Sequence, residues 1–282
     1  MINRILNSLP SIYKEHARNN CLYEILDQVA KLGIKKSGLR NGGNNQIKLD
    51  GFGQLNFPYY KMGSIDTLDL FGLDELIIFS FYWTNRNRYK KVADIGANLG
   101  LHSILMGRCG WVVDAYEPDP IHTKILEKNL VLNQIDKVTL HQVAVSDVCG
   151  ELKFVRVLGN TTGSHLEGSK VNLYGELERF KTKVVSIDSI MDGIDFVKLD
   201  AEGQEKNIIL GLNARYWGSI DMIVEVGSAD NAKLIFEHLK TLGVKMFSQK
   251  LGWQQVNSLD GMPISYKEGS LFITVKHQMP WK

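Results

Sequence analysis

The segment Asp94-Ile95-Gly96-Ala97-Asn98-Leu99-Gly100 combines an acid, an amide and two glycines within seven positions. Gly96 permits a tight turn with its backbone close to a ligand, and Gly100 lets a following helix approach the sheet. A dinucleotide-binding loop needs a second glycine where this chain has Asn98, because the backbone there must meet a pyrophosphate. The segment therefore predicts a ligand-binding loop of a different kind.

A second acid, Glu117, lies 21 residues after Gly96, at the end of the next apolar run. A carboxylate at that place accepts hydrogen bonds from both hydroxyls of a ribose, so it indicates an adenosine site. Asp94 would repel the pyrophosphate of NAD but would attract the cationic amino acid end of S-adenosylmethionine. We therefore predict S-adenosylmethionine as the cofactor, bound by Asp94, Gly96, Asn98, Gly100 and Glu117. The alternative is that Asp94 and Glu117 are ordinary acids at strand ends.

The segment Ala144-Val145-Ser146-Asp147 follows the third apolar run and is placed to line an adenine ring. We expect Ala144 to contact the ring. Two interpretations of Asp147 are open. Its carboxylate accepts a hydrogen bond from the adenine amino group, or it only begins a turn before Gly150.

Asp200 and Glu202 are candidates for the chemical step. Side chains alternate along a strand, so Lys198 and Asp200 lie on the same face of the expected strand 195–199. Asp200 and Glu202 follow the carboxyl end of this strand, where ligands bind. Buried charges need partners, which predicts an ion pair between Lys198 and a carboxylate, with Glu225 of a neighbouring strand also placed to join. A hydroxyl group that accepts a methyl needs a base, and Asp200 or Glu202 can serve. The alternative is that the acids from Glu202 to Glu205 only favour the start of a helix.

His165 belongs to an insertion of about twenty-five residues without clear periodicity. Such insertions are commonly lids or binding loops, and an imidazole titrates near neutral pH, so His165 is a third candidate base. A solvated loop histidine is the alternative. We predict no metal site, because the chain has no Cys-x-x-Cys and no Cys/His cluster. A divalent ion held by Asp200, Glu202 and His165 stays open as an alternative that no spacing demands.

The elements that position these residues follow from the hydrophobic pattern. From Lys91 onward, apolar strands alternate with amphipathic helices, which predicts βαβ units and a mainly parallel sheet with helices on both faces. The expected strands are 92–95, 111–116, 138–145, 195–199 and 221–226, and the expected helices are 99–108, 120–133, 204–212 and 231–242. Two further strands, 151–158 and 183–187, flank the irregular insertion. The last segments, 245–249 and 270–276, lack a helix between them and predict an antiparallel strand at one edge.

Residues 1–90 form an N-terminal extension in this interpretation, and residues 91–282 form the catalytic domain. Apolar residues at helical spacing predict a helix over 21–33, with Asn20 as its cap. Asp50-Gly51 lies between two short β-type segments and predicts a hairpin. A second, apolar helix is expected around residues 74–83.

Composition sets the broad class of the protein. The net charge is +2, and residues 1–40 hold seven basic and three acidic residues, which leaves 26 basic against 28 acidic elsewhere. No face of the domain is expected to track phosphates, so nucleic acid is not a predicted partner. The three cysteines are widely spaced and the apolar stretch 76–83 is too short for a bilayer. We expect a cytoplasmic protein without a membrane span.

Four segments together resemble the FkbM-type methyltransferases, in that family's order. They are 94–100, Tyr116-Glu117-Pro118, 144–147 and Val197-Lys198-Leu199-Asp200-Ala201-Glu202-Gly203-Gln204-Glu205. The resemblance covers roughly residues 90–227, with Ser186-Ile187-Asp188 and Val224-Glu225 as further matches. It implies a class I methyltransferase fold, S-adenosylmethionine as cofactor, and transfer to a hydroxyl of a glycan or small molecule.

Three other classes of protein fit the sequence less well. Methyltransferases of exocyclic amines in nucleic acids carry Asn/Asp-Pro-Pro-Tyr/Phe where this chain reads Asp200-Ala201-Glu202-Gly203. A nucleotide-dependent oxidoreductase is disfavoured by Asn98. A non-catalytic relative would not be expected to keep the cofactor residues, although the sequence alone does not decide this.

Overall fold

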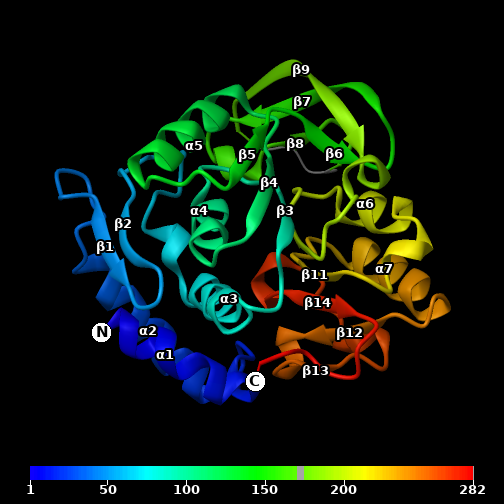
Figure 1. Ribbon diagram of the computed structural model, residues 1–282, viewed down its shortest axis with the longest axis horizontal. Helices are drawn as coiled ribbons and strands as arrows, with labels where there is room; N and C mark the ends of the chain where they lie inside the picture. Colours follow the sequence, from blue (N-terminus) through cyan, green and yellow to red (C-terminus); the bar gives the residue numbers. More distant parts are fainter. Residues whose placement is uncertain (170–174, 282) are drawn as a thin grey trace.

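The computed structural model describes residues 1–169 and 175–281. Within these residues the centre is an eight-stranded sheet with the order β13-β12-β14-β11-β10-β3-β4-β5 (Figure 1). Its strands are β3 (Lys91–Ile95), β4 (Val112–Tyr116), β5 (Val138–His141), β10 (Phe196–Leu199), β11 (Asp221–Val224), β12 (Lys245–Ser248), β13 (Gln254–Gln255) and β14 (Leu271–Thr274). The five strands from β11 to β5 are parallel, which confirms the predicted sheet.

Two details of the sheet differ from the predictions. The antiparallel strand β14 does not lie at the edge, since it is inserted between β11 and β12. The expected third strand, 138–145, is two strands, because the chain turns where the N–H of Val143 donates to the carbonyl oxygen of His141. The second part, β6 (Ala144–Ser146), belongs to another sheet. Only two polar residues, His141 and Gln142, stand at the turn, and such a pair also occurs within strands, so the pattern does not reveal it.

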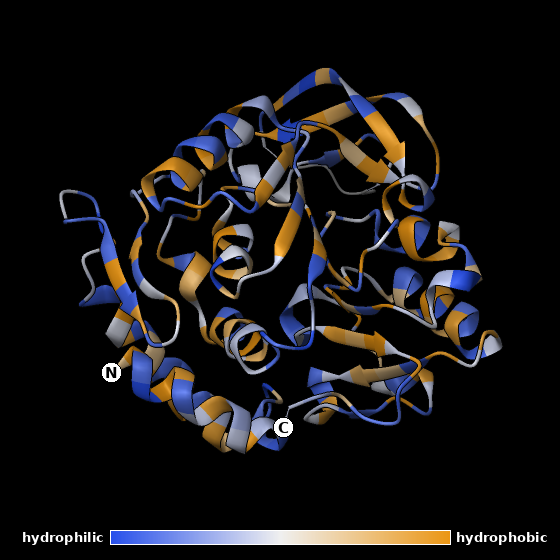
Figure 2. Cartoon of the chain, viewed as in Figure 1, coloured by the Kyte–Doolittle hydropathy of each residue, from blue (hydrophilic) through white to orange (hydrophobic). Residues whose placement is uncertain are grey.

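Helices cover both faces of the sheet, as predicted (Figure 1). On one face lie α3 (Leu73–Thr84), α4 (Leu101–Arg108) and α5 (Pro120–Leu132), and on the other α6 (Glu205–Gly211) and α7 (Ala229–Thr241). Alternate side chains of one strand enter opposite layers, so Phe196 packs in the first layer and Val197 in the second. Figure 2 shows α5 and α7 striped in orange and blue, as expected of helices with one face against a sheet.

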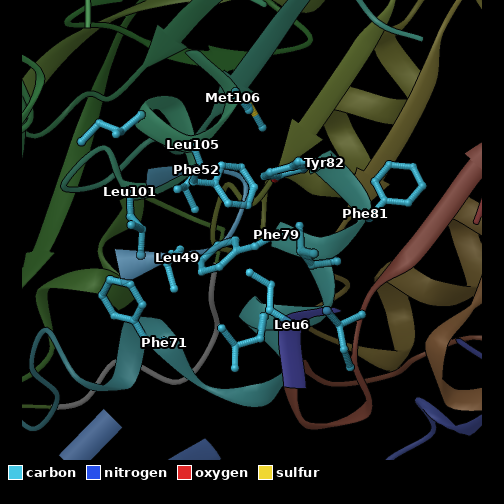
Figure 3. Packing of buried hydrophobic residues seen from close by; sticks show 14 of the residues in the cluster. Leu6, Leu49, Phe52, Phe71, Phe79, Phe81, Tyr82, Leu101, Leu105 and Met106 are labelled. Carbon is cyan, nitrogen blue, oxygen red and sulfur yellow. The ribbon is translucent and has the colours of Figure 1, made fainter. Parts of the chain in front are cut away.

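The N-terminal segment packs onto the first of these layers. It contains α1 (Ile2–Ser8), α2 (Cys21–Lys35) and the hairpin of β1 (Gln46–Leu49) and β2 (Gly53–Asn56). The predicted α2, its Asn20 cap, the hairpin and α3 are all confirmed. Figure 3 shows Leu49 and Phe71 of this segment near Leu101 of α4, and Leu6 belongs to the same cluster. One apolar core therefore includes side chains from both sides of residue 90.

A smaller sheet covers the end of the central sheet near β5 (Figure 1). Its order is β6-β9-β7-β8, with β7 (Gly150–Val157), β8 (His165–Leu166) and β9 (Leu177–Ser186). The insertion is thus more regular than predicted, because β7 and β9 pair along eight residues. Arg156 of β7 is 5% exposed and donates two hydrogen bonds of 2.6 Å to Asp119, the N-cap residue of α5. This ion pair fixes the smaller sheet to α5.

No helix in the described ranges is long and apolar enough to cross a membrane.

Candidate functional site

A cavity of about 250 Å³ lies at the carboxyl ends of the parallel strands. Four parts of the chain form its walls: the N-terminal segment, the loops after β3, β4, β10 and β11, the link into β6, and the insertion. Ligands of open α/β sheets bind at this edge. The lining includes Ile65, Asp69, Leu70, Glu75, Gly96, Asn98, Glu117, Val143, Ala144, Val145, Thr161, Thr162, Asp200, Glu202 and Glu225.

The loop after β3 is built around two glycines with positive φ. At Gly96, with φ of 81°, a Cβ atom would lie 1.8 Å from the carbonyl oxygen of Asp200, so the loop can pass the end of β10 only with glycine there. At Gly100 a Cβ would lie 2.6 Å from Cγ of Leu126. We expected Gly100 to let the following helix approach the sheet. This is wrong, because the close contact at Gly100 is with the helix α5.

Asp94 lies beneath this loop and is fully buried. Its Oδ2 accepts a hydrogen bond of 2.5 Å from Ser103, and its Oδ1 lies 3.8 Å from Nζ of Lys198. Asp94 is not among the residues that line the cavity. A contact with a ligand would therefore be electrostatic, through the loop above it.

Glu117 and Asn98 face the cavity together. The two carboxylate oxygens of Glu117 accept backbone hydrogen bonds of 2.8 Å, one from Asn98 and one from Asp119. Burial raises the pKa of Glu117 to about 7. Asn98 has a φ of 51°, and its buried Oδ1 has no hydrogen-bond partner within the described residues. Both side chains thus offer acceptors to a ligand.

The apolar wall of the cavity comes from the link between β5 and β6. Val143, Ala144 and Val145 line it, together with Tyr116 of β4. Asp147 is exposed, does not line the cavity and accepts a hydrogen bond of 2.9 Å from Ser146. Of the two interpretations of Asp147, this placement supports the turn.

Carboxylates gather around Lys198 on the opposite wall. Nζ of Lys198 lies 3.4 Å from Oδ2 of Asp200, which confirms the predicted ion pair. Although burial disfavours the ammonium ion, the neighbouring Asp200 and Asp94 raise the pKa of Lys198 above its usual range. Burial, with Asp200 and Glu75 nearby, raises the pKa of Glu225 well above its usual value. Lys198 therefore keeps its charge, and the ionised form of Glu225 is disfavoured.

Glu75 is a cavity residue that the sequence analysis missed. It lies in the first turn of α3, and its Oε2 is 3.0 Å from Nε2 of His102. Despite burial, His102 and Lys198 hold the pKa of Glu75 below its usual value. The sequence shows only an apolar helix at this place, and no local signal connects it with the strand ends more than twenty positions later.

Glu205 holds the loop that presents Asp200 and Glu202. Glu205 is fully buried and accepts backbone hydrogen bonds from Gly203 and Ala201, at 2.8 and 3.2 Å from its Oε1. Burial raises its pKa to about 7. Glu202, with a φ of 50°, lines the cavity. Of the acids from Glu202 to Glu205, Glu205 therefore has a structural role at the start of the helix, whereas Asp200 and Glu202 line the cavity.

His165 does not reach the cavity. The residue is 2% exposed, and its Nδ1 lies 3.0 Å from the carbonyl oxygen of Gly163. Its neighbours Ser164 and Leu166 line the cavity, so alternation turns His165 to the other side. His165 is neither a solvated loop residue nor within reach of a bound acceptor, and its prediction as a base is wrong.

A different histidine, His122 of α5, lines the cavity. Its Nε2 lies 3.0 Å from Oγ1 of Thr161, and burial lowers its pKa. Residues 1–169 and 175–281 contain no group of three or more His, Cys, Asp or Glu side chains that could hold a metal ion.

Residues 94–248 match the model of the methyltransferase FkbM domain, which is more than half of the 282 residues. The chain belongs to the FkbM methyltransferase family. Membership confirms the resemblance found in the four sequence segments. The class I methyltransferase fold is likewise confirmed.

Methyltransferase sdnD of Sordaria araneosa is similar to this FkbM-family chain, with 26% identity over 166 residues. The match covers 47% of this chain and 64% of that protein, so it spans less than two thirds of the relative. Two solved structures are also similar. The METTL16 methyltransferase domain has 14% identity and a TM-score of 0.44, with 98% of this chain and 93% of that chain covered. An S-adenosylmethionine-dependent methyltransferase from Agrobacterium tumefaciens has 10% identity and a TM-score of 0.43, with 86% and 72% covered.

Proposed function

We propose that this protein transfers a methyl group from S-adenosylmethionine to a hydroxyl oxygen of a glycan or small molecule. One observation carries the proposal. A single cavity joins the loop of Gly96 and Asn98, with Glu117, to the carboxylates of Asp200 and Glu202. The first group suits an adenosine, and the second suits the removal of a proton from an alcohol.

The residues present fit the proposed cofactor. Ionised Glu117 can accept hydrogen bonds from ribose hydroxyls, and the orphaned Oδ1 of Asn98 can accept from a ligand donor. The walls near Val143 and Val145 suit an apolar ring face. Asp94, Asp200 and the other carboxylates favour a cationic ligand over a pyrophosphate. No lining residue in the described part of the chain is Lys or Arg, so no side-chain cation there would balance the charge of a pyrophosphate against these carboxylates.

The bound cofactor would supply an activated methyl group. This chain must orient the acceptor hydroxyl and take its proton, since an alcohol does not lose one unaided near neutral pH. Asp200 is the better placed base, because its ion pair with Lys198 fixes the direction of its carboxylate. Glu202 is the second candidate. Glu225 also lines the cavity and can hydrogen-bond the acceptor and so help to orient it.

Location and partners belong to the same proposal. We expect a cytoplasmic enzyme, because its three cysteines, Cys21, Cys109 and Cys149, are free in the structure. We expect no nucleic acid partner, since a phosphate backbone would meet a cavity mouth lined by carboxylates.

The experiment that tests the reaction uses S-adenosylmethionine labelled with ¹³C at its methyl group. The protein is incubated with the labelled cofactor and a panel of alcohols, amino alcohols and sugars, and the products are examined by NMR. We expect the label at an oxygen, which the chemical shift of the methyl carbon distinguishes from nitrogen and sulfur. A product methylated only at nitrogen or carbon contradicts the proposal.

A further inference from the structure

The walls of the cavity carry an unbalanced negative charge. Six carboxyl side chains line it, while no Lys or Arg of the described chain does. These residues are Asp69, Glu75, Glu117, Asp200, Glu202 and Glu225. The imidazole of His122 supplies no charge, because burial lowers its pKa.

The negative charge stays in excess even when the groups most easily protonated are counted in their protonated forms. Glu117 and Glu225 are then counted as neutral, and Lys198 and His102 of the adjoining smaller cavity are counted as cations. Four carboxylates still face two cations, and buried Asp94 adds a fifth. S-adenosylmethionine has two cationic groups and one carboxylate, so it supplies a single net positive charge. At least one carboxylate is left for the acceptor to neutralise.

Two of the carboxylates come from the N-terminal segment and lie outside the matched family region of residues 94–248. Glu75 opens α3, and Asp69 lies at the exposed rim of the cavity. Oδ2 of Asp69 accepts a hydrogen bond of 2.8 Å from the backbone of Asp66, while its Oδ1 makes none within the described residues. Asp69 therefore has an oxygen available to a ligand at the rim.

Inside the cavity, Glu225 offers a second polar group to an acceptor. Its carboxyl group lines the cavity, is partly exposed there and lies near Asp200. A polar acceptor in the cavity can therefore contact Glu225.

Backbone hydrogen bonds between residues 62–64 and 159–161, here called the seam, hold the N-terminal segment at the cavity. The N–H of Ser64 donates to the carbonyl oxygen of Gly159 at 2.7 Å, and the N–H of Thr161 donates to that of Met62 at 3.0 Å. At Gly63, with φ of 90°, a Cβ atom would lie 2.1 Å from the carbonyl oxygen of Gly159. The two chain segments can therefore approach this closely only with glycine at position 63. The seam places the segment that carries Asp69 and Glu75 as a fixed wall.

We propose that the acceptor is a hydroxyl compound with a protonated amine, of the amino sugar or amino alcohol kind, selected by Asp69 and Glu75. The inference rests on the proposed methyl transfer and adds the class of acceptor to it. The amine neutralises the carboxylates of the N-terminal wall, while the hydroxyl lies near Asp200.

The test compares three sugars with the same ring and different charge. Protein saturated with S-adenosylhomocysteine is titrated calorimetrically with D-glucosamine, D-glucose and D-glucuronate. We expect D-glucosamine to bind at least about tenfold more tightly than D-glucuronate, with D-glucose between them, and a preference that weakens as salt is added. Asp69→Asn keeps the oxygen that Asp66 needs, so it should fold normally and lose part of the preference.

Glu75→Gln should reduce the preference further, with folding followed by thermal unfolding. Glu237→Gln is the matched control, because Glu237 is an exposed acid of α7 outside the cavity, and it should keep the full preference. Equal or tighter binding of D-glucose or D-glucuronate, or no binding of D-glucosamine, overturns the inference. Protein that does not bind S-adenosylhomocysteine contradicts the proposed function instead, so the two failures are distinguishable.

Discussion

At the scale of single residues, Glu117 connects the cofactor loop with the second strand of the sheet. Both of its oxygens accept backbone N–H groups, from Asn98 and Asp119, and the side chain is only 6% exposed. Each carboxylate oxygen can accept more than one hydrogen bond, so a ribose can still bind. The residue therefore orders the loop and contacts the ligand.

Removal of the Glu117 side chain should weaken cofactor binding. We expect Glu117→Ala to reduce the affinity for S-adenosylhomocysteine by about 2–4 kcal/mol, since two charge-assisted hydrogen bonds are lost. Stability should also fall, by about 1–3 kcal/mol, because two backbone N–H groups lose their acceptor. Calorimetric titration and chemical unfolding measure the two effects, with exposed Glu127→Ala as the control. Unchanged affinity in Glu117→Ala would show that the ribose is held elsewhere.

Cofactor binding should depend on pH through the same carboxyl group. Burial raises the pKa of Glu117 to about 7 in the free protein, and only the ionised form accepts from both ribose hydroxyls. Affinity therefore rises as pH increases through 7, and we expect it to be about tenfold weaker at pH 6 than at pH 8. Titrations at both values, in buffers of different ionisation enthalpy, also measure the proton released at pH 7. A flat profile, or tighter binding at pH 6, contradicts this role.

Measurements of turnover in variants can show whether Asp200 or Glu202 is the general base. Loss of the true base should lower kcat by roughly a hundredfold or more and leave S-adenosylhomocysteine affinity close to that of the unchanged protein. We expect this result for Asp200→Asn, and a smaller effect for Glu202→Gln. His165→Ala serves as a comparison that should not remove a base, because His165 faces away from the cavity. Normal turnover in both acid variants would place the base elsewhere.

At the scale of elements, the spacing of apolar residues was enough to predict the strands of the central sheet and the helices between them. It failed where the chain changes direction without a glycine, a proline or a long polar stretch, as in the turn at Val143 that separates β5 from β6. The extent of β9 was underestimated, because four of its first six residues are polar and three of these are exposed. The place of β14 depends on pairing between distant strands, which no local pattern encodes.

The contact between the cofactor loop and the end of β10 gives a prediction at this scale. We expect Gly96→Ala to abolish measurable S-adenosylhomocysteine binding and to lower thermal stability, since its Cβ would overlap the carbonyl group of Asp200. Gly110→Ala is the matched control, because Gly110 has a similar positive φ, 89°, with no atom within 4 Å of the added Cβ. The control should show only the backbone strain, about 1–2 kcal/mol. Equal effects of both substitutions would show that the contact is unimportant.

At the scale of the whole molecule, the cavity is shared between the sheet and the N-terminal segment. Gly96, Asn98, Glu117, Asp200 and Glu202 were predictable together, because parallel strands end at the same edge. Asp69 and Glu75 were not predictable, because their place depends on how α3 packs against α4 and on the seam with the insertion. The division into an N-terminal extension, residues 1–90, and a catalytic domain, residues 91–282, stays a prediction. The two parts share one apolar core.

The central claim, that the cavity binds S-adenosylmethionine, is tested most directly by calorimetric titration in EDTA. Separate samples receive S-adenosylhomocysteine, S-adenosylmethionine and NAD. The account predicts that the first two bind at one site per chain without a metal, and that NAD does not bind, because the cavity offers carboxylates and no cation to a pyrophosphate. Binding of NAD together with no binding of either adenosyl sulfur compound would contradict it.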